Sequence, residues 1–205
     1  MNFTLYLLVG LLLFIVLVIR NIFKAYVIYM MGDPGPKYRG LLSTNPVSHV
    51  DPVGTLFLFI TPIISGGSFV IGWTKYVDYD PSYFRNRDFA EFLVSIAGLG
   101  SFFVVIFLSR VLISFLPELQ LIFYLLAMMS AFLFALNLIP LKGFDGYILW
   151  GLILRKVNKK IFYLWEDFQY RNQFAILLLF FPMVYLLFPV FKFIAINVMK
   201  LGGWI

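Results

Sequence analysis

The sequence predicts an all-α integral membrane protein with about five to six transmembrane or re-entrant helices, and with short extended or loop segments between the first and second spans. Composition is the first observation behind this prediction. Of the 205 residues, 62% are hydrophobic and 13% are charged, whereas an ordinary soluble domain is about half apolar and about a quarter charged. The mean hydropathy is +0.94. The second observation is a series of long uncharged stretches, and the third is the Pro and Gly content of the segments between them.

Four uncharged stretches come close to the length of about 20 apolar residues that a helix needs to cross the hydrocarbon core. They comprise residues 3–19, 92–109, 119–141 and 174–191. The third continues as a largely apolar segment to residue 154, and a straight helix over 119–154 would be about 54 Å long, longer than a bilayer is thick. A break near Pro140 and a change of direction are therefore predicted.

A fifth apolar stretch, residues 51–73, has a different character. It contains Pro52, Pro62, Gly66 and Gly67, which interrupt a simple helix. This pattern predicts a kinked or re-entrant hairpin, which is tolerated at membrane depth where protein shields the backbone. The polar segment before it, residues 32–51, is rich in Pro and Gly, so turns and short extended pieces are expected there.

Basic residues gather in two segments beside the spans. The first segment contains Arg20, Lys24, Lys37 and Arg39, and the second contains Arg155, Lys156, Lys159, Lys160 and Arg171. The positive-inside rule places both segments in the cytoplasm and the N-terminus outside. Juxtamembrane cations are common in membrane proteins, so they do not indicate nucleic-acid binding. The expected partners are the lipid bilayer and other integral membrane proteins, through transmembrane helix packing.

Four short motifs follow one another along the chain. They are AYVIYMMGDP at residues 25–34, NPVSHVDPVGT at 45–55, GWTK at 72–75 and NLIPLKGFDG at 137–146. In this order they resemble the site-2 protease family of intramembrane zinc metalloproteases, in particular its small bacterial members. The resemblance covers most of the chain and implies a single site-2-protease-like membrane domain over residues 1–205, in the cytoplasmic (inner) membrane of a bacterium.

Active members of that family carry an HExxH motif immediately ahead of the first of these segments. Two imidazoles four residues apart share a helix face and bind one zinc ion, while the Glu acts on the bound water. Here Arg20 and Lys24 occupy the two histidine positions, and Asn21 occupies the glutamate position. The chain has one histidine and no cysteine, so one copy cannot supply two imidazoles. The sequence therefore predicts a degenerate member that is not an enzyme, a pseudoenzyme of the zinc metalloprotease class without a cofactor.

Other family positions are retained. By the resemblance, Asp145 stands at the third metal-ligand position, Asn137 at a position that contacts the substrate strand, and His49 in the HxDP segment. Leu99 and Phe102 replace the Pro and Asn of the family's GPxxN segment. We therefore predict no catalytic and no metal-binding residue, four degenerate catalytic positions (Arg20, Asn21, Lys24 and Asp145) and two groove-like residues (Asn137 and His49).

Two of these positions admit more than one interpretation. Arg20 and Lys24 either extend toward the cytoplasmic interface or pair with Asp145, whose carboxylate would be costly in a membrane-embedded site without a cation. His49 and Asp51 either form an alternative metal or proton site or satisfy backbone donors and acceptors in a Pro-rich loop.

The predicted function is that of a pseudoprotease, a non-catalytic membrane subunit that binds partner transmembrane segments. An accessory or structural subunit of a larger membrane complex is favoured over a regulator that sequesters substrates. Two alternatives stay open. One is a residual intramembrane metallopeptidase with a non-standard site, for example a metal bound between two copies. The other is a small transporter or channel, although Lys142 and Asp145 are nearly alone among ionisable residues in lying away from span ends.

Overall fold

The computed structural model describes residues 3–67 and 69–204. It is 76% helical, with no strand among these residues and with four long apolar helices, which confirms the prediction of an all-α membrane protein. By length and composition, the four helices that can cross a membrane are α1 (Phe3–Met30), α4 (Arg87–Leu112), α5 (Gln120–Asn137) with the η3 turn (Pro117–Leu119) before it, and the Pro182–Leu201 part of α8 (Gln173–Leu201).

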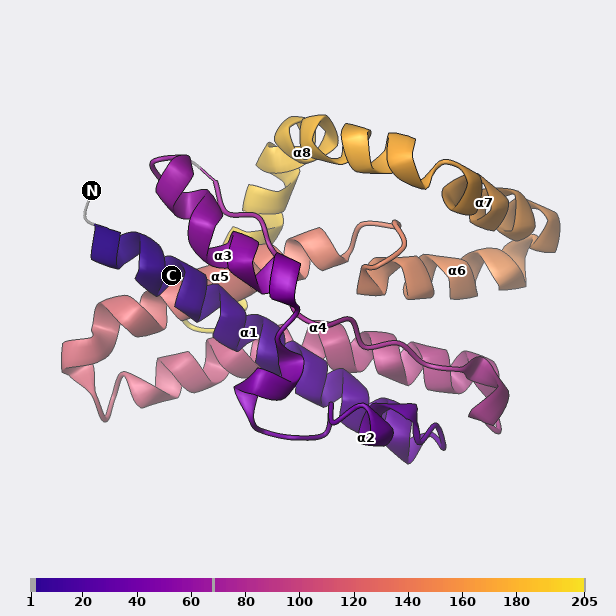
Figure 1. Cartoon of the computed structure of the whole chain (residues 1–205), viewed down its shortest axis with the longest axis horizontal. Helices are drawn as coiled ribbons and strands as arrows, with labels where there is room; N and C mark the ends of the chain where they lie inside the picture. Colours follow the sequence, from indigo (N-terminus) through magenta and orange to yellow (C-terminus); the bar gives the residue numbers. More distant parts are fainter. Residues whose placement is uncertain (1–2, 68, 205) are drawn as a thin grey trace.

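Helix α4 is the central element of the bundle. It packs against α1, α5 and α6 (Asp145–Val157). In the most apolar 18-residue stretch of α4, 56% of the residues are buried inside the protein, against 17% in the corresponding stretch of α8. Phe102 and Val105 of α4 meet the buried Val16 of α1. Figure 1 shows α1, α4 and α5 lying close to one another, with α8 at the margin. Helix α8 is therefore the span with the least protein around it.

Helix α3 (Pro52–Ile64) and the chain that follows it form the predicted hairpin. The Asp51 carboxylate caps the helix by accepting hydrogen bonds from the N–H groups of Val53 and Gly54. Beyond the helix, Gly66 and Gly67 adopt the left-handed φ values of 61° and 82° that the reversal requires. The chain then returns along α3, and the Trp73 N–H donates to the Gly54 carbonyl at 3.2 Å. With 13 residues, α3 is about 20 Å long, too short to span a bilayer alone.

The predicted break lies between α5 and α6. Helix α5 ends at Asn137, and α6 begins at Asp145 after a turn that contains Pro140 and Gly143, which has a φ of 104°. Helix α6 then reverses into α7 (Lys159–Arg171) at Asn158, whose side chain accepts hydrogen bonds from the first N–H groups of α7. The break expected near Pro140 is thus present, as a loop between the two helices (Figure 1), whereas the expected change of direction is not evident there.

Helix α8 extends ten residues beyond the predicted end of the last span, from residue 191 to Leu201. Lys192 ends the uncharged stretch in the sequence, but it is exposed, so its charge does not interrupt the helix. Val198 and Met199 pack against Ala127 and Ala131 of α5. Packing of the apolar residues beyond Lys192 against α5 therefore stabilises the last part of the helix.

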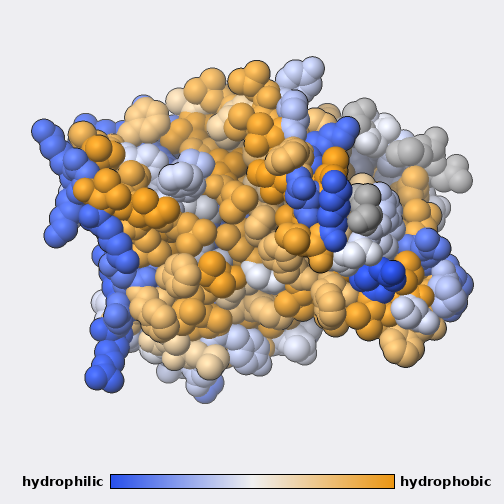
Figure 2. Space-filling view, turned by 180° about the vertical axis from the view of Figure 1, so that it is seen from behind, coloured by the Kyte–Doolittle hydropathy of each residue, from blue (hydrophilic) through white to orange (hydrophobic). Residues whose placement is uncertain are grey.

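Apart from α3, the chain between α1 and α4 contains only short elements. These are α2 (Gly35–Tyr38), η1 (Pro46–His49) and η2 (Pro81–Tyr83), and residues 69–80 form neither helix nor strand. Figure 2 shows a largely hydrophobic face whose hydrophilic residues gather along one edge, with smaller groups toward the opposite end. This distribution fits a protein whose middle lies in lipid.

Candidate functional site

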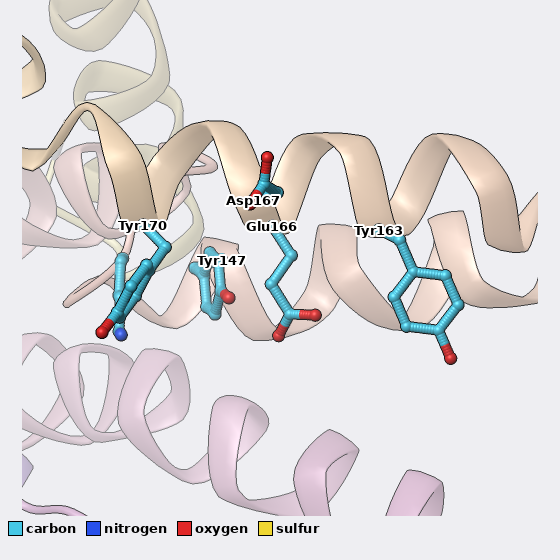
Figure 3. A pocket seen from close by; sticks show the side chains of 6 residues that line it. Tyr147, Tyr163, Glu166, Asp167 and Tyr170 are labelled. Carbon is cyan, nitrogen blue, oxygen red and sulfur yellow. The ribbon is translucent and has the colours of Figure 1, made fainter.

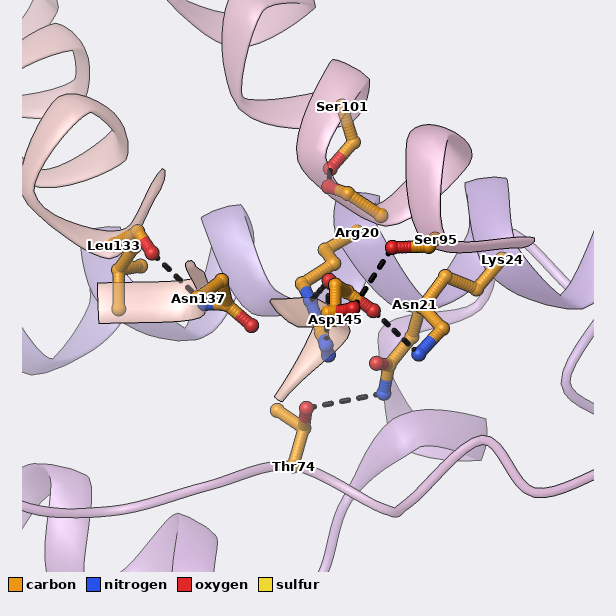
Figure 4. Close-up of polar contacts among 10 residues, drawn as sticks. Arg20, Asn21, Lys24, Thr74, Ser95, Ser101, Leu133, Asn137 and Asp145 are labelled. Atoms are coloured by element: carbon orange, nitrogen blue, oxygen red, sulfur yellow. Dashed lines mark hydrogen bonds and ion pairs between the residues drawn. The ribbon is translucent and has the colours of Figure 1, made fainter. Parts of the chain in front are cut away.

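The candidate site is an ion-pair cluster between α1 and α6. The Arg20 side chain donates from Nε and Nη2 to Asp145 Oδ2 at 3.0 and 2.9 Å, and Lys24 Nζ donates to Oδ1 at 2.7 Å (Figure 4). The side-chain exposed fractions are 11% for Arg20, 3% for Lys24 and 0% for Asp145. One buried carboxylate is thus held by two buried cations. We call these three residues the buried charge cluster.

The local sequence explains why these groups meet. Arg20 and Lys24 are four residues apart and therefore share one face of α1. Gly98 lets α4 approach Asp145 closely, because a Cβ atom at this position would lie 2.3 Å from Asp145 Oδ2. The Ser95 hydroxyl, one turn earlier on α4, donates to the Asp145 carbonyl at 2.8 Å. Three helices are thereby joined at one buried carboxylate.

Asn21 connects α1 to the returning chain of the α3 hairpin. Its Nδ2 atom donates to Thr74 Oγ1 at 3.0 Å and to the Lys75 carbonyl at 2.7 Å. Thr74 and Lys75 belong to the GWTK motif, so this motif meets the segment of α1 that stands at the family's HExxH position. The side chain is 2% exposed, and its amide holds the hairpin beside the cluster.

The geometry separates the two interpretations of Arg20 and Lys24. Both side chains are directed toward Asp145 and away from solvent (Figure 4), so they do not extend to an interface as snorkelling cations. The expected ion pair with Asp145 is present, and both cations take part in it. That Arg20, Asn21, Lys24 and Asp145 are degenerate catalytic positions stays a prediction.

Asn137 and His49 are buried but make local contacts. Asn137 lies near the cluster in Figure 4, and its Nδ2 atom donates to the Leu133 carbonyl at 2.8 Å. His49 is fully buried, with Nε2 2.9 Å from the Ser43 carbonyl. Asp51 caps α3 as described above. These contacts agree with the interpretation that His49 and Asp51 satisfy the backbone, and the groove-like role of Asn137 and His49 stays a prediction.

Sequence reasoning missed Ser95, Gly98 and Thr74. A usable signal existed for the first two, because small residues one helical turn apart in an apolar span often mark close helix contacts. Thr74 lies in the GWTK motif, but nothing in the sequence indicated its contact with Asn21.

A second polar network joins the start of α4 to the end of α6. Glu91 accepts a hydrogen bond from Arg87 at 2.9 Å and a further one from Arg155, and Arg155 Nη1 lies 3.5 Å from Asp88 Oδ1. Burial and the nearby Glu91 carboxylate raise the pKa of the Tyr79 hydroxyl, so this phenol stays neutral over the ordinary pH range. We call Arg87, Asp88, Glu91 and Arg155 the interface network.

Two cavities lie along the α6–α7 hairpin. The first has a volume of about 470 Å³, and Figure 3 shows its side chains projecting from both helices. It is lined by Lys142, Tyr147, Tyr163, Glu166, Asp167 and Tyr170. The second has a volume of about 360 Å³ and is lined by Asp88, Arg155, Lys156, Lys159, Phe162 and Tyr163. Neither is lined by a residue of the buried charge cluster.

The residues at the predicted metal position do not fit a zinc ion. Zinc sites in proteins use Cys, His, Asp or Glu, and a catalytic site supplies three such ligands. Over residues 3–67 and 69–204, no three of these side chains gather at one place. Asp145 is held by two cations, which would repel a dication at the same position.

Comparison with known proteins found one informative relative. The chain is 31% identical over 135 residues to the "Putative zinc metalloprotease YwhC" of Bacillus subtilis (strain 168). The matched region covers 60% of this chain and 58% of the relative, so the chain spans less than two thirds of the relative's length. No protein-family model matches the chain, and no solved structure matches it.

The name of this relative corrects one prediction made from the sequence. The sequence predicts that the chain is not an enzyme, but the relative is named a zinc metalloprotease, and this name points to a protease. The missing HExxH motif led to the opposite prediction, because that inference considered only ligands from one copy of the chain. The similarity shows that the chain has a homologue named as a zinc metalloprotease. Together with the four motifs, this finding is consistent with a site-2 protease-like family.

Proposed function

We propose that this chain is a membrane subunit on a site-2-protease-like scaffold that binds a partner's transmembrane segment within a larger membrane complex. The observation that carries the proposal is the buried charge cluster. Arg20 and Lys24 hold Asp145 and the Ser95 hydroxyl donates to the Asp145 carbonyl, so α1, α4 and α6 are joined by the chain's own side chains. A scaffold joined in this way can present its helices to a partner without a metal.

The least covered helix, α8, is the proposed contact surface. Only 17% of its span window is buried within the chain, and Tyr185, Leu186 and Phe193 are exposed by 69% or more. Transmembrane helices associate through close packing and polar contacts. A partner helix lying on α8 would meet a continuous apolar surface.

The proposed location is the cytoplasmic membrane of a bacterium with the N-terminus outside. Support comes from the basic residues around the α6–α7 turn, which the positive-inside rule assigns to the cytoplasm. The chain has no cysteine, so a single cysteine at Lys159 can be labelled selectively. In intact cells, an impermeant thiol reagent is expected to leave this position unmodified.

Photo-crosslinking in the native membrane tests the proposed function. A benzoylphenylalanine at Leu186 is expected to give one discrete protein adduct after purification in gentle detergent, identified by mass spectrometry. The same residue at Val157 is the matched control, since this position is 76% exposed but lies outside the four candidate spans. Lipid adducts alone at Leu186, or the same adducts at both positions, would contradict the proposal.

The second candidate function is intramembrane proteolysis, which the name of the relative favours. The described residues of one chain supply no set of three metal ligands, so this function requires ligands from a second copy or from another protein. Elemental analysis of the purified native complex tests it. Stoichiometric zinc, together with cleavage of a membrane substrate that Asp145→Ala abolishes, would favour this candidate over the first.

A further inference from the structure

The cavity at the α6–α7 turn has an excess of positive charge. Arg155, Lys156 and Lys159 line it together with one carboxylate, Asp88, which leaves two positive charges in excess. Glu91 and Arg87, the other two members of the interface network, carry opposite charges, so they do not change this excess. Neither Lys156 nor Lys159 forms an ion pair among the described residues.

The cavity has a fixed wall. The Arg155 guanidinium is held by Glu91, which is 4% exposed, and lies over the Phe162 ring with 5.3 Å between Arg155 Cζ and the ring centroid. Lys156 lies in the last turn of α6 and Lys159 begins α7, so the tight turn at Asn158 places both cations at the same cavity. The cavity is therefore a shaped cationic site and differs from a scatter of surface lysines.

The uncharged length of α4 indicates that the cavity would stand at the level of lipid headgroups. Residues 92–109 of α4 carry no charge, and as a helix they are about 27 Å long, close to the thickness of the hydrocarbon core. Asp88, which lines the cavity, lies one turn before Phe92. Tyr163 in the cavity wall is of a residue type that is enriched at the membrane interface.

We propose that the α6–α7 turn binds the phosphate of an anionic membrane lipid, with Lys156 and Lys159 as the cations that contact it. An anionic phosphodiester matches the charge excess, whereas the phosphate of a zwitterionic lipid is already balanced by its own headgroup cation. The neighbouring cavity carries two carboxylates, Glu166 and Asp167, against one lysine, Lys142, and repels the same ligand (Figure 3). This site does not depend on the proposed partner-binding function or on the orientation of the chain.

The test titrates the purified full-length chain, in a neutral detergent, with dioctanoylphosphatidylglycerol or dioctanoylphosphatidylcholine. Native mass spectrometry counts the bound lipid. The phosphatidylglycerol is expected to bind more tightly. Because each Lys near an anionic lipid surface contributes about 1 kcal/mol, Lys156→Gln with Lys159→Gln is expected to raise its Kd by about tenfold or more. The conservative pair Lys156→Arg with Lys159→Arg is expected to retain binding.

The matched control removes two charges elsewhere. Lys192→Gln with Lys200→Gln on α8 has the same net charge as the test variant, lies outside the cavity and is expected to leave the Kd unchanged. The single variants Lys156→Gln and Lys159→Gln are measured as well, so a folding defect in the double variant does not decide the result. Equal affinity for both lipids, or equal losses in the α8 control, would overturn the proposal. Displacement of the lipid by an equal concentration of inorganic phosphate would assign the site to free phosphate instead.

Discussion

The buried charge cluster joins α1 to α6 beside α4, and the interface network joins α4 to α6. Both use charged side chains, but they differ in burial and in charge balance. The cluster places two cations on one carboxylate, and no member is more than 11% exposed. The network places two cations on two carboxylates, and its Arg87 and Asp88 side chains are 55% and 49% exposed. The protein therefore contains ion pairs in two environments, one buried and one partly exposed to solvent.

The difference determines what each site contributes. A buried pair need not stabilise the fold, because removing both charges from water offsets their attraction, but the loss of one partner leaves an unpaired buried charge. An exposed pair is screened by solvent and contributes little. The cluster thus specifies where α1 and α6 meet beside α4, and the network acts as a weaker clamp between α4 and α6.

The largest expected effect is that of Asp145→Ala. Breaking a buried pair from one side typically costs about 3–5 kcal/mol, and here two cations would lose their shared carboxylate. We expect the free energy of unfolding, measured by denaturant titration in mixed micelles, to fall by this amount.

The combined variants make the comparison sharper. Asp145→Ala with Lys24→Met is expected to be less destabilised than Asp145→Ala, and Arg20→Met added to both changes should bring stability nearer to the parent chain, because no unpaired charge is left. Lys24→Met alone is expected to cost less than Asp145→Ala, since Arg20 and Asp145 then form a balanced pair. A triple variant no more stable than Asp145→Ala would show that the cluster does not act as a charge unit.

Replacement of Gly98 tests the packing beside the cluster. In Gly98→Ala the added Cβ would lie 2.3 Å from Asp145 Oδ2, so either the Asp145 carboxylate must leave its position between the two cations or α4 and α6 must move apart. Overpacking of this kind costs about 1–3 kcal/mol. The control is Gly100→Ala on the same helix, where a Cβ meets nothing within 4 Å; a helix former there is expected to be neutral or mildly stabilising. Equal effects at both glycines would contradict the close approach.

In the interface network, Glu91→Gln is expected to cost about 1–3 kcal/mol. The buried carboxylate is lost, but Arg155 keeps Asp88 as a neighbour and reaches solvent, so less charge is left unpaired than at Asp145. The measurement is the same denaturant titration. A loss equal to that of Asp145→Ala would remove the distinction between the two sites.

Much of this structure follows from sequence patterns with a direct physical cause. Charge-free length predicts the spans, and Pro140 with Gly143 predicts the break before α6. For Arg20 and Lys24 the sequence offered two interpretations, and pairing with Asp145 was one of them, because a buried carboxylate requires a cation; the structure shows that both cations pair with it. Other features do not follow. The continuation of α8 past Lys192 depends on packing against α5, and the position of Gly98 beside Asp145 depends on how α4 crosses α6.

The smallest effect is expected at the exposed pair of α7, which sets the baseline for both sites. Arg171 Nε lies 2.7 Å from Asp167 Oδ1, and the two side chains are 74% and 51% exposed. This distance equals that between Lys24 Nζ and Asp145 Oδ1, so distance alone would predict that the two ion pairs contribute equally to stability. Exposed pairs four residues apart on a helix contribute only about 0.3–0.5 kcal/mol. We expect Asp167→Asn to lower the free energy of unfolding by no more than this, and the small loss to shrink further in concentrated salt, which screens exposed charges but not buried ones. A loss of several kcal/mol at Asp167, or a salt-sensitive loss at Asp145, would show that burial is not what separates the two kinds of ion pair.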